Sequence, residues 1–243
     1  MQKFIAGWVW MCLFVCFGGG SAKAARVEVP VDVGVGPATY FINNPIFLHH
    51  PVNVGLKISV AAVINRALIR RYRGKIPARY RRLTRRLREV KLRPLVLGLI
   101  PDSLIISPTF QGTQIYGVIF RPFALGLGIP LGPLNVSLSA GILLNYTYII
   151  STTQLSPGGP TFFTQPAVQI THFLRPGIDA KLEFELPISE HFLISFGWAS
   201  QVYVPQRLGA SPFAEFGPFE SWVWHFGQAF LLFHFRFPFE TNL

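Results

Sequence analysis

Hydrophobic and polar residues alternate with a period of two along most of this chain. The clearest runs cover 52–60, 136–148, 178–186 and 192–198, and a shorter run covers 27–33. In 178–186, for example, Ile, Ala, Leu, Phe and Leu alternate with Asp, Lys and two Glu residues. A strand sorts such a sequence onto two faces, whereas a helix would scatter it around its axis. The pattern predicts a chain built from long β-strands.

Eight strands account for these runs and for three less regular ones. The predicted strands are 27–41, 51–62, 103–110, 114–127, 134–150, 167–187, 191–204 and 222–238. Several are longer than the five or six residues usual in globular proteins. A tilted membrane strand needs about nine to eleven residues. Strand length therefore favours a membrane barrel over a soluble β-sandwich.

The predicted connections alternate in length. Those at 128–133 and 187–190 are tight, whereas 151–166 and 205–221 are longer and rich in Pro and Gly. Outer-membrane barrels have short periplasmic turns and longer external loops. We therefore expect an all-β fold over 25–243: a monomeric, eight-stranded, antiparallel up-and-down transmembrane β-barrel in the cell outer membrane. An even number of strands leaves both ends on the periplasmic side.

The first 24 residues have the features of a signal peptide. Lys3 precedes an apolar run over 4–17, and Ala22-Lys23-Ala24 forms a small-x-small cleavage pattern. An uncleaved membrane anchor is the alternative. Both cysteines, Cys12 and Cys16, lie in this segment. A mature chain without them would have no disulfide, no thiolate zinc site and no cysteine nucleophile.

The net charge of +11 comes from one segment. Charged residues make up only 14% of the chain, against about 25% in ordinary soluble domains. Thirteen of the 22 Lys and Arg residues lie within 66–93, where Glu89 is the only acid, so nine basic residues face ten acidic ones elsewhere. If an anionic partner binds this protein, we expect it to bind this basic segment.

This basic segment has a helical pattern. Tyr80, Leu83, Leu87 and Val90 are spaced by three, four and three residues, and Pro77 suits the first turn of a helix. A shorter helix could precede it, within 61–72. We therefore predict a basic α-helical insertion over 63–101, on the periplasmic side between the second and third strands.

Three interpretations of the insertion remain open. A basic amphipathic helix can lie on anionic lipid headgroups or on peptidoglycan, it can bind nucleic acid, or it can be a solvated linker. Export argues against nucleic acid. The residues predicted to contact an anionic surface are Arg70, Arg71, Arg73, Arg79, Arg81, Arg82, Arg85, Arg86 and Arg88.

The polar face of the strands predicts a charged barrel interior. If the apolar residues face lipid, a set of charged residues points inward: Arg175, Asp179, Lys181, Glu183, Glu185, His234 and Arg236, with Lys57 and Arg121 as further candidates. Buried charges are tolerated when they are paired, so we expect a network of ion pairs. An eight-stranded barrel is wide enough only for its own side chains, which favours a filled interior over an ion pathway.

Aromatic residues fall near the predicted strand ends. They are Tyr40, Phe41, Tyr146, Tyr148, Tyr203, Trp222 and Trp224. Such residues can form the interfacial girdle of a membrane barrel. Ordinary core packing is the alternative.

The last predicted strand resembles the C-terminal assembly signal of small outer-membrane barrels. The stretch 225–232 has a polar residue, a glycine and two late hydrophobic positions, although the chain continues to Leu243. The architecture thus resembles eight-stranded barrels such as the OmpA transmembrane domain and OmpW-type proteins. The resemblance favours a structural or binding role, and it leaves a narrow carrier for small apolar compounds as an alternative.

A lipid A-modifying acyl hydrolase is the enzymatic alternative, because some small barrels of this kind have that activity. Ser189, Glu190 and His191 are neighbours here, but they fall in a predicted tight turn, which favours a turn role. The pair His49-His50 lacks further ligands, so no metal site and no cofactor are expected. The sequence favours a protein that is not an enzyme.

Overall fold

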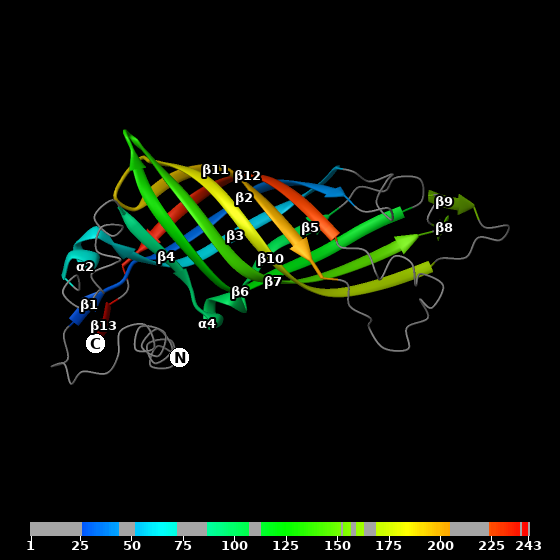
Figure 1. The fold of residues 1–243 in the computed structure, drawn as a ribbon, viewed down its shortest axis with the longest axis horizontal. Coiled ribbons are helices and arrows are strands. Elements are labelled where there is room, and N and C mark those ends of the chain that lie inside the picture. Colours follow the sequence, from blue (N-terminus) through cyan, green and yellow to red (C-terminus); the bar gives the residue numbers. More distant parts are fainter. Residues whose placement is uncertain are drawn as a thin grey trace.

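The computed structural model describes residues 26–43, 52–71, 87–106, 113–151, 153–156, 159–162, 169–204, 224–238 and 240–242. Long antiparallel strands dominate it (Figure 1). The main sheet contains β2 (Val31–Asn43), β3 (Val52–Asn65), β4 (Glu89–Arg93), β5 (Pro101–Ile106), β6 (Thr113–Leu131), β7 (Leu134–Ser151), β10 (Gln169–Pro187), β11 (Phe192–Tyr203) and β12 (Trp224–Phe237). The order β2-β12-β11-β10-β7-β6-β4-β3 closes on itself because β2 also pairs with β3. The sheet is therefore a closed barrel.

The barrel wall has eight positions for nine strands. The short strands β4 and β5 share one position, since both pair with β3 on one side and with β6 on the other. Every neighbouring pair is antiparallel. The eight-stranded antiparallel barrel predicted from the alternating pattern is thus present. Small additional strands pair outside it: β1 (Arg26–Glu28) with β13 (Glu240–Asn242), and β8 (Thr153–Ser156) with β9 (Gly159–Phe162).

The two ends of the barrel differ in their connections. One end has the turn between β6 and β7, where Gly132 has a φ of 60°, and the turn between β10 and β11. The same end has the end of β3, the start of β4, and the β1–β13 pair (Figure 1). We call this the short-turn end. Apart from the connection between β3 and β4, the longer connections leave from the opposite end, as the sequence predicts.

The predicted helical insertion over 63–101 is only partly helical. The helix α2 (Arg66–Arg71) begins directly after β3, and Asn65 caps it by accepting a hydrogen bond from the Leu68 amide at 2.9 Å. The predicted longer helix through Val90 is wrong at its end, because Glu89–Arg93 is strand β4. Residues 72–86, which contain the rest of that predicted helix, lie outside the described residues.

The shared wall position is interrupted between β4 and β5. The chain leaves the wall at Pro94, makes the short helix α4 (Leu95–Gly98), and returns at Pro101. Along this interruption, residues 58–61 of β3 and 121–123 of β6 have no partner in either short strand. Figure 1 shows α4 standing off the outside of the barrel. We call the interruption the wall break.

A bulge in β6 lies beside the wall break. The pairing of β6 with β7 shifts between Phe120 and Phe123. Before the shift odd-numbered residues such as Ile119 and Arg121 are buried, and after it even-numbered residues such as Ala124 are buried. One extra residue in a strand reverses which positions face inward, which explains why the alternation in this strand is irregular in the sequence.

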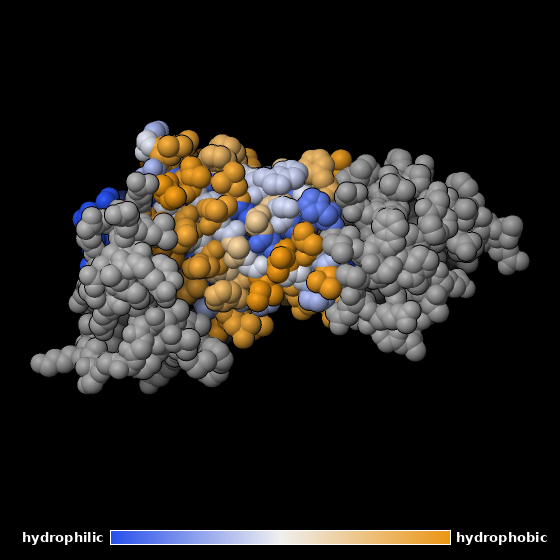
Figure 2. All heavy atoms as spheres, viewed as in Figure 1, coloured by the Kyte–Doolittle hydropathy of each residue, from blue (hydrophilic) through white to orange (hydrophobic). Residues whose placement is uncertain are grey.

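The two faces of the wall differ in polarity as the alternation predicts. On β10, the side chains of Asp179, Lys181 and Glu183 are buried inside the barrel, whereas Ile178 is 64% exposed on the outside. The other strands repeat this arrangement, with Leu138, Phe196 and Phe235 among the exposed apolar residues. Figure 2 shows apolar side chains gathered on the outer wall. None of the helices in the described part of the chain has the length and hydrophobicity that a membrane-crossing helix requires.

The predicted aromatic girdle is only partly present. Phe41 and Tyr146 are exposed on the outer wall, but Tyr40 and Tyr203 are completely buried inside the barrel. Their parity places them there, since Tyr40 follows Asp32 and Ala38 on the inner face of β2. For these two tyrosines the girdle prediction is wrong. Trp222 and the side chain of Trp224 lie outside the described residues.

Candidate functional site

The barrel interior has an apolar layer and a charged layer. The apolar layer lies toward the end with longer connections and contains Ala38, Tyr40, Ile105, Ile115, Ile119, Leu143, Ala199, Tyr203, Phe226, Phe230 and Leu232. The charged layer lies toward the short-turn end and contains Asp32, Lys57, Glu89, Lys91, Arg93, Asp102, Arg121, Asp179, Lys181, Glu183, Glu185, His234 and Arg236. The charged layer is the candidate functional site.

The first group in the charged layer surrounds Lys91. Its ammonium lies 2.7 Å from Glu185 and 3.2 Å from Asp32. The Arg236 guanidinium is 3.0 Å from Glu89, and the Asn135 amide donates a hydrogen bond of 2.8 Å to Glu185. Five strands, β2, β4, β7, β10 and β12, thereby meet through polar side chains. The group holds the short-turn end of the barrel together.

A hydrogen-bonded chain continues from Asp32 around the inner wall. His234 Nδ1 is 2.9 Å from Asp32 Oδ1, and His234 Nε2 is 2.8 Å from Ser195 Oγ. Ser195 in turn donates to Glu183 at 2.6 Å, and Lys181 is 2.8 Å from Glu183. The order Ser–His–Asp resembles that of a nucleophilic triad.

Two features argue against a catalytic role for this chain of residues. The Ser195 hydroxyl donates its one hydrogen bond to Glu183, so it does not donate to His234. Ser195, His234 and Asp32 are at most 2% exposed, so a substrate carbonyl has no approach to the hydroxyl. The arrangement is a structural link between β2, β12, β11 and β10.

The second group closes the wall break from inside. Asp102, at the start of β5, lies 2.8 Å from the Lys57 ammonium and 3.0 Å from the Arg93 guanidinium. Arg93, at the end of β4, also donates a hydrogen bond of 2.7 Å to the carbonyl of Ile100. Gln228 accepts a further hydrogen bond from Lys57 at 2.9 Å. The two ends of the interrupted strand are thus tied together by side chains.

A third group pairs β6 with β10 and β7. Arg121 is 2.9 Å from Asp179 and donates a hydrogen bond of 3.1 Å to Ser139. Gly141 leaves room for this contact, because a Cβ there would lie 2.7 Å from the Arg121 Nε. The bulge that turns Arg121 inward is therefore matched by a residue without a side chain on the neighbouring strand.

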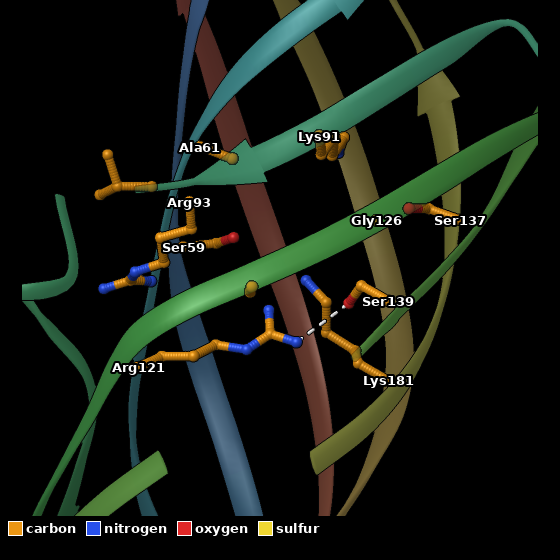
Figure 3. A pocket seen from close by; sticks show the side chains of 11 residues that line it. Ser59, Ala61, Lys91, Arg93, Arg121, Gly126, Ser137, Ser139 and Lys181 are labelled. Carbon is orange, nitrogen blue, oxygen red and sulfur yellow. Dashed lines mark hydrogen bonds between the residues drawn. The ribbon is translucent and has the colours of Figure 1, made fainter. Parts of the chain in front are cut away.

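A small cavity lies between these groups at the wall break. Its volume is about 20 Å³, which is enough for about one water molecule. It is lined by Ser59, Val60, Ala61, Lys91, Arg93, Arg121, Ala124, Gly126, Ser137, Ser139 and Lys181 (Figure 3). A carrier for apolar compounds would need a cavity lined by residues such as Phe and Leu. This cavity is basic and hydroxyl-rich, so it gives that alternative no support.

The residues predicted from sequence fall into two sets. Arg175, Asp179, Lys181, Glu183, Glu185 and His234 are all buried on the inner wall, and Arg236 is partly buried beside them. Arg175 lies apart, opposite Asn145 on β7 and near the apolar layer. Of the predicted surface residues, Arg70 is exposed and Arg88 is half-buried. The Arg71 side chain and Arg73, Arg79, Arg81, Arg82, Arg85 and Arg86 lie outside the described residues.

Several members of the charged layer were not predicted from the sequence. Lys91, Arg93 and Glu89 were assigned to the basic helix, although they alternate with Val90 and Leu92 as in a strand. Asp32 and Asp102 were not predicted at all. Asp32 had a usable signal, because it alternates with Val31 and Val33. Asp102 had none, since the irregularity at the start of β5 disturbs the alternation there.

The stretch Ser189-Glu190-His191 lies in the turn between β10 and β11. The Ser189 hydroxyl accepts hydrogen bonds from the backbone amides of His191 and Phe192, at 3.4 and 3.1 Å, as a turn residue does. Within the described ranges, no group of three or more His, Cys, Asp and Glu residues is arranged to hold a metal ion. His49 and His50 lie outside these ranges.

Comparisons with known proteins give structural neighbours only. No family model and no curated protein matches the sequence. Neisserial surface protein A is similar in structure, with 9% identity over 85% of this chain and 97% of that one, and a TM-score of 0.46. Ail of Yersinia pestis has 8% identity over 87% and 100%, with a TM-score of 0.43. A major outer membrane protein from Thermus thermophilus has 11% identity over 85% and 99%, with a TM-score of 0.45.

Proposed function

We propose that this protein is an outer-membrane β-barrel with a structural or binding role, and that its basic segment 66–88 contacts anionic lipid headgroups. The observation that carries the first part is the outer wall. Exposed apolar residues such as Leu138, Ile178 and Phe235 recur on it around a closed ring of strands. Closed barrels satisfy the backbone hydrogen bonds that lipid cannot, and an apolar outer band is what lipid contact requires.

The filled interior supports a structural or binding role over conduction. The charged layer is crossed by close ion pairs, such as Lys91 with Glu185 and Arg121 with Asp179. The apolar layer fills the other part of the barrel with large side chains, including Tyr40, Tyr203 and Phe226. Eight strands leave no room for more.

The place of the basic segment supports its contact with a membrane surface. Both of its junctions are at the short-turn end, where β3 ends at Asn65 and β4 begins at Glu89. Lys91 and Arg93 point into the barrel, which leaves eleven basic residues between 66 and 88 and no acidic one. Each basic residue near an anionic surface contributes about 1 kcal/mol. Peptidoglycan is the other anionic surface on the periplasmic side.

Vesicle sedimentation tests this proposal. The barrel is refolded in detergent, its binding to phosphatidylglycerol vesicles is compared with that to phosphatidylcholine vesicles, and a variant with Arg81, Arg82, Arg85 and Arg86 changed to Gln is compared with the wild type. We expect the variant to bind anionic vesicles at least tenfold more weakly at low salt, with a smaller difference at high salt.

The matched control changes the same four residues to Lys, which keeps the charge. This variant should bind anionic vesicles nearly as well as the wild type. Equal binding by the Gln variant and the wild type would refute the lipid contact and favour a solvated linker. Binding to isolated peptidoglycan instead of vesicles would move the contact to the cell wall.

A further inference from the structure

His234 is buried on the inner face of β12, in contact with three other strands. Its ring lies against Gly34 on β2, where a Cβ would come within 2.6 Å of the imidazole. The two ring nitrogens reach Asp32 on β2 and Ser195 on β11, and Glu183 on β10 lies 3.3 Å from Nε2. These three partners all offer oxygen atoms to the ring, so the positions of its hydrogens follow from the hydrogen bonds that each oxygen can make.

The contact at Nδ1 requires a hydrogen on that nitrogen. The partner atom, Asp32 Oδ1, is 2.9 Å away. The other oxygen of the same carboxylate lies 3.2 Å from the Lys91 ammonium, so the carboxyl group is ionised. An ionised carboxylate only accepts hydrogen bonds. Nδ1 is therefore the donor.

The contact at Nε2 requires a second hydrogen. Ser195 Oγ is 2.6 Å from Glu183 Oε1, and Glu183 is paired with Lys181 at 2.8 Å. Two oxygens this close have a hydrogen between them, and it belongs to the hydroxyl because the ionised carboxylate has none. The Ser195 oxygen can then only accept from Nε2, which is 2.8 Å away. A ring that donates from both nitrogens is an imidazolium cation.

The charges around His234 are balanced only if the ring is charged. Ion pairs of at most 3.9 Å connect it to one group of the charged layer. In the described part of the chain this group has four carboxylates and three permanent cations: Asp32, Glu89, Glu183 and Glu185 with Lys91, Lys181 and Arg236. The groups of Asp102 and Asp179 hold three cations for two carboxylates, but their ion pairs are separate from those of His234. An uncompensated buried charge is costly, and an imidazolium compensates the fourth carboxylate.

We propose that His234 is a buried imidazolium and that it makes the closure of the barrel sensitive to pH. In this form it bonds to β2, β11 and β10 at once, beside the pairing of β12 with β2. Loss of one ring proton to solvent would leave Asp32 or Glu183 without a charged partner on the ring. Acidic surroundings then strengthen the short-turn end of the barrel, and alkaline surroundings weaken it. The site lies inside the barrel, so it is independent of the contact proposed for segment 66–88.

Nitrogen NMR of the refolded barrel tests the protonation state directly. The chain has six histidines, and nitrogen-15 is introduced only in their rings. An ordinary histidine side chain is neutral at about pH 8. We expect one ring to have both nitrogens protonated at this pH, and its signals to be absent from the spectrum of His234→Gln. Six neutral rings in the wild type, or a doubly protonated ring that persists in His234→Gln, would overturn the proposal.

The pH dependence of stability tests the consequence. The folded barrel keeps a proton on His234 that the unfolded chain gives up above about pH 6.5, so a rise in pH favours unfolding. The unfolding equilibrium constant is measured by urea titration in detergent micelles. Relative to His234→Gln, the wild-type constant should rise by up to about tenfold per pH unit above about pH 6.5. Parallel pH profiles of the two proteins would refute the link.

Two further variants separate the charge from the shape of the site. Asp32→Asn keeps an acceptor for Nδ1 but removes a charge that holds the proton, so the doubly protonated ring should be lost at a lower pH than in the wild type. His191→Gln, at an exposed position in the turn after β10, is the control and should keep the wild-type signal and pH profile. An Asp32→Asn spectrum that titrates like the wild type would contradict the proposal. The wild-type spectrum needs no variant, so the protonation state is tested even if a variant fails to fold.

Discussion

Asp102 holds two cations inside the barrel wall. Its carboxylate contacts both Lys57 and Arg93, and all three side chains are at most 3% exposed. Removing one member of a buried ion pair leaves the other charge without compensation, which costs about 3–5 kcal/mol. Asp102 is on β5, Arg93 on β4 and Lys57 on β3. Loss of this one carboxylate therefore weakens the contacts among all three strands.

Asp102→Ala is therefore expected to lower the free energy of unfolding by about 3–5 kcal/mol. Adding Lys57→Met in the same chain should recover part of this loss, because it removes one of the two uncompensated charges. Urea unfolding followed by tryptophan fluorescence measures both changes. Glu190→Ala, at an exposed turn position, is the control and should change stability by less than about 0.5 kcal/mol. An Asp102→Ala variant as stable as this control would contradict the role of the ion pairs.

At the residue scale, the sequence predicted interior charges where the strand pattern was regular. On β10, Asp179, Lys181 and Glu183 alternate with exposed apolar residues, and the structure has them on the inner wall. The prediction failed at Lys91 and Arg93 because basic residues surround them in the sequence. Alternation predicts which face a residue is on but not its ion-pair partner, since the two closest partners of Lys91, Glu185 and Asp32, are 94 and 59 residues away.

The pattern of residues 87–93 is compatible with either a helix or a strand. Leu87 and Val90 continue the helical spacing from Tyr80, while Val90 and Leu92 fit the two-residue period of a strand. Local pattern alone cannot decide between them over so few residues. The strand prevails because both of its edges are paired, Val90 with Ile64 on β3 and with Leu127 on β6. Such pairing joins segments distant in sequence, which explains why the prediction missed β4.

Between β4 and β5 the chain makes an excursion out of the wall, residues 94–100, which includes α4. This excursion depends on the close approach of Gly98 to the backbone of β6. A Cβ on this residue would lie 2.4 Å from both Cα and the carbonyl oxygen of Pro122, and these backbone atoms cannot easily move. The helix also begins without a side-chain cap. It is therefore stabilised by packing on β6 and by the bond from Arg93 to Ile100 at its end.

Gly98→Val should displace α4 from β6 and lower the free energy of unfolding by about 1–3 kcal/mol. Leu99→Ala is the control in the same excursion. Leu99 is 74% exposed, so its truncation should cost less than about 0.5 kcal/mol. Urea titrations of the two variants and the wild type give the comparison. If Gly98→Val were as stable as Leu99→Ala, the contact with Pro122 would not fix the excursion.

On the scale of the whole molecule, closure of the sheet determines which residues meet. Pairing between β2 and β12, about 200 residues apart in sequence, brings Asp32 to His234. Once the wall is closed, each strand has one inner and one outer face, and the composition of both follows from alternation. The charged interior and the apolar outer band are thus properties of the closed ring and not of any one strand.

The outer band gives a test that separates a membrane barrel from a soluble one. Ile178 lies at the middle of β10 and is 64% exposed on the outer wall. In water, Ile178→Arg at such a position should cost less than about 0.5 kcal/mol. In a bilayer, an arginine at mid-depth costs about 2–4 kcal/mol, falling toward zero near the interface.

We therefore expect Ile178→Arg to reduce the fraction of protein that assembles in outer-membrane fractions, measured by heat-modifiable migration on gels. Ile188→Arg is the matched control, because Ile188 is similarly exposed, at 56%, but lies in the turn after β10. The control should assemble like the wild type. Equal assembly of both variants would exclude lipid contact at Ile178. Recovery of the wild type as a soluble periplasmic protein would exclude the membrane barrel itself. Because the two substitutions add the same charge, a difference between them can arise only from where each position lies on the barrel.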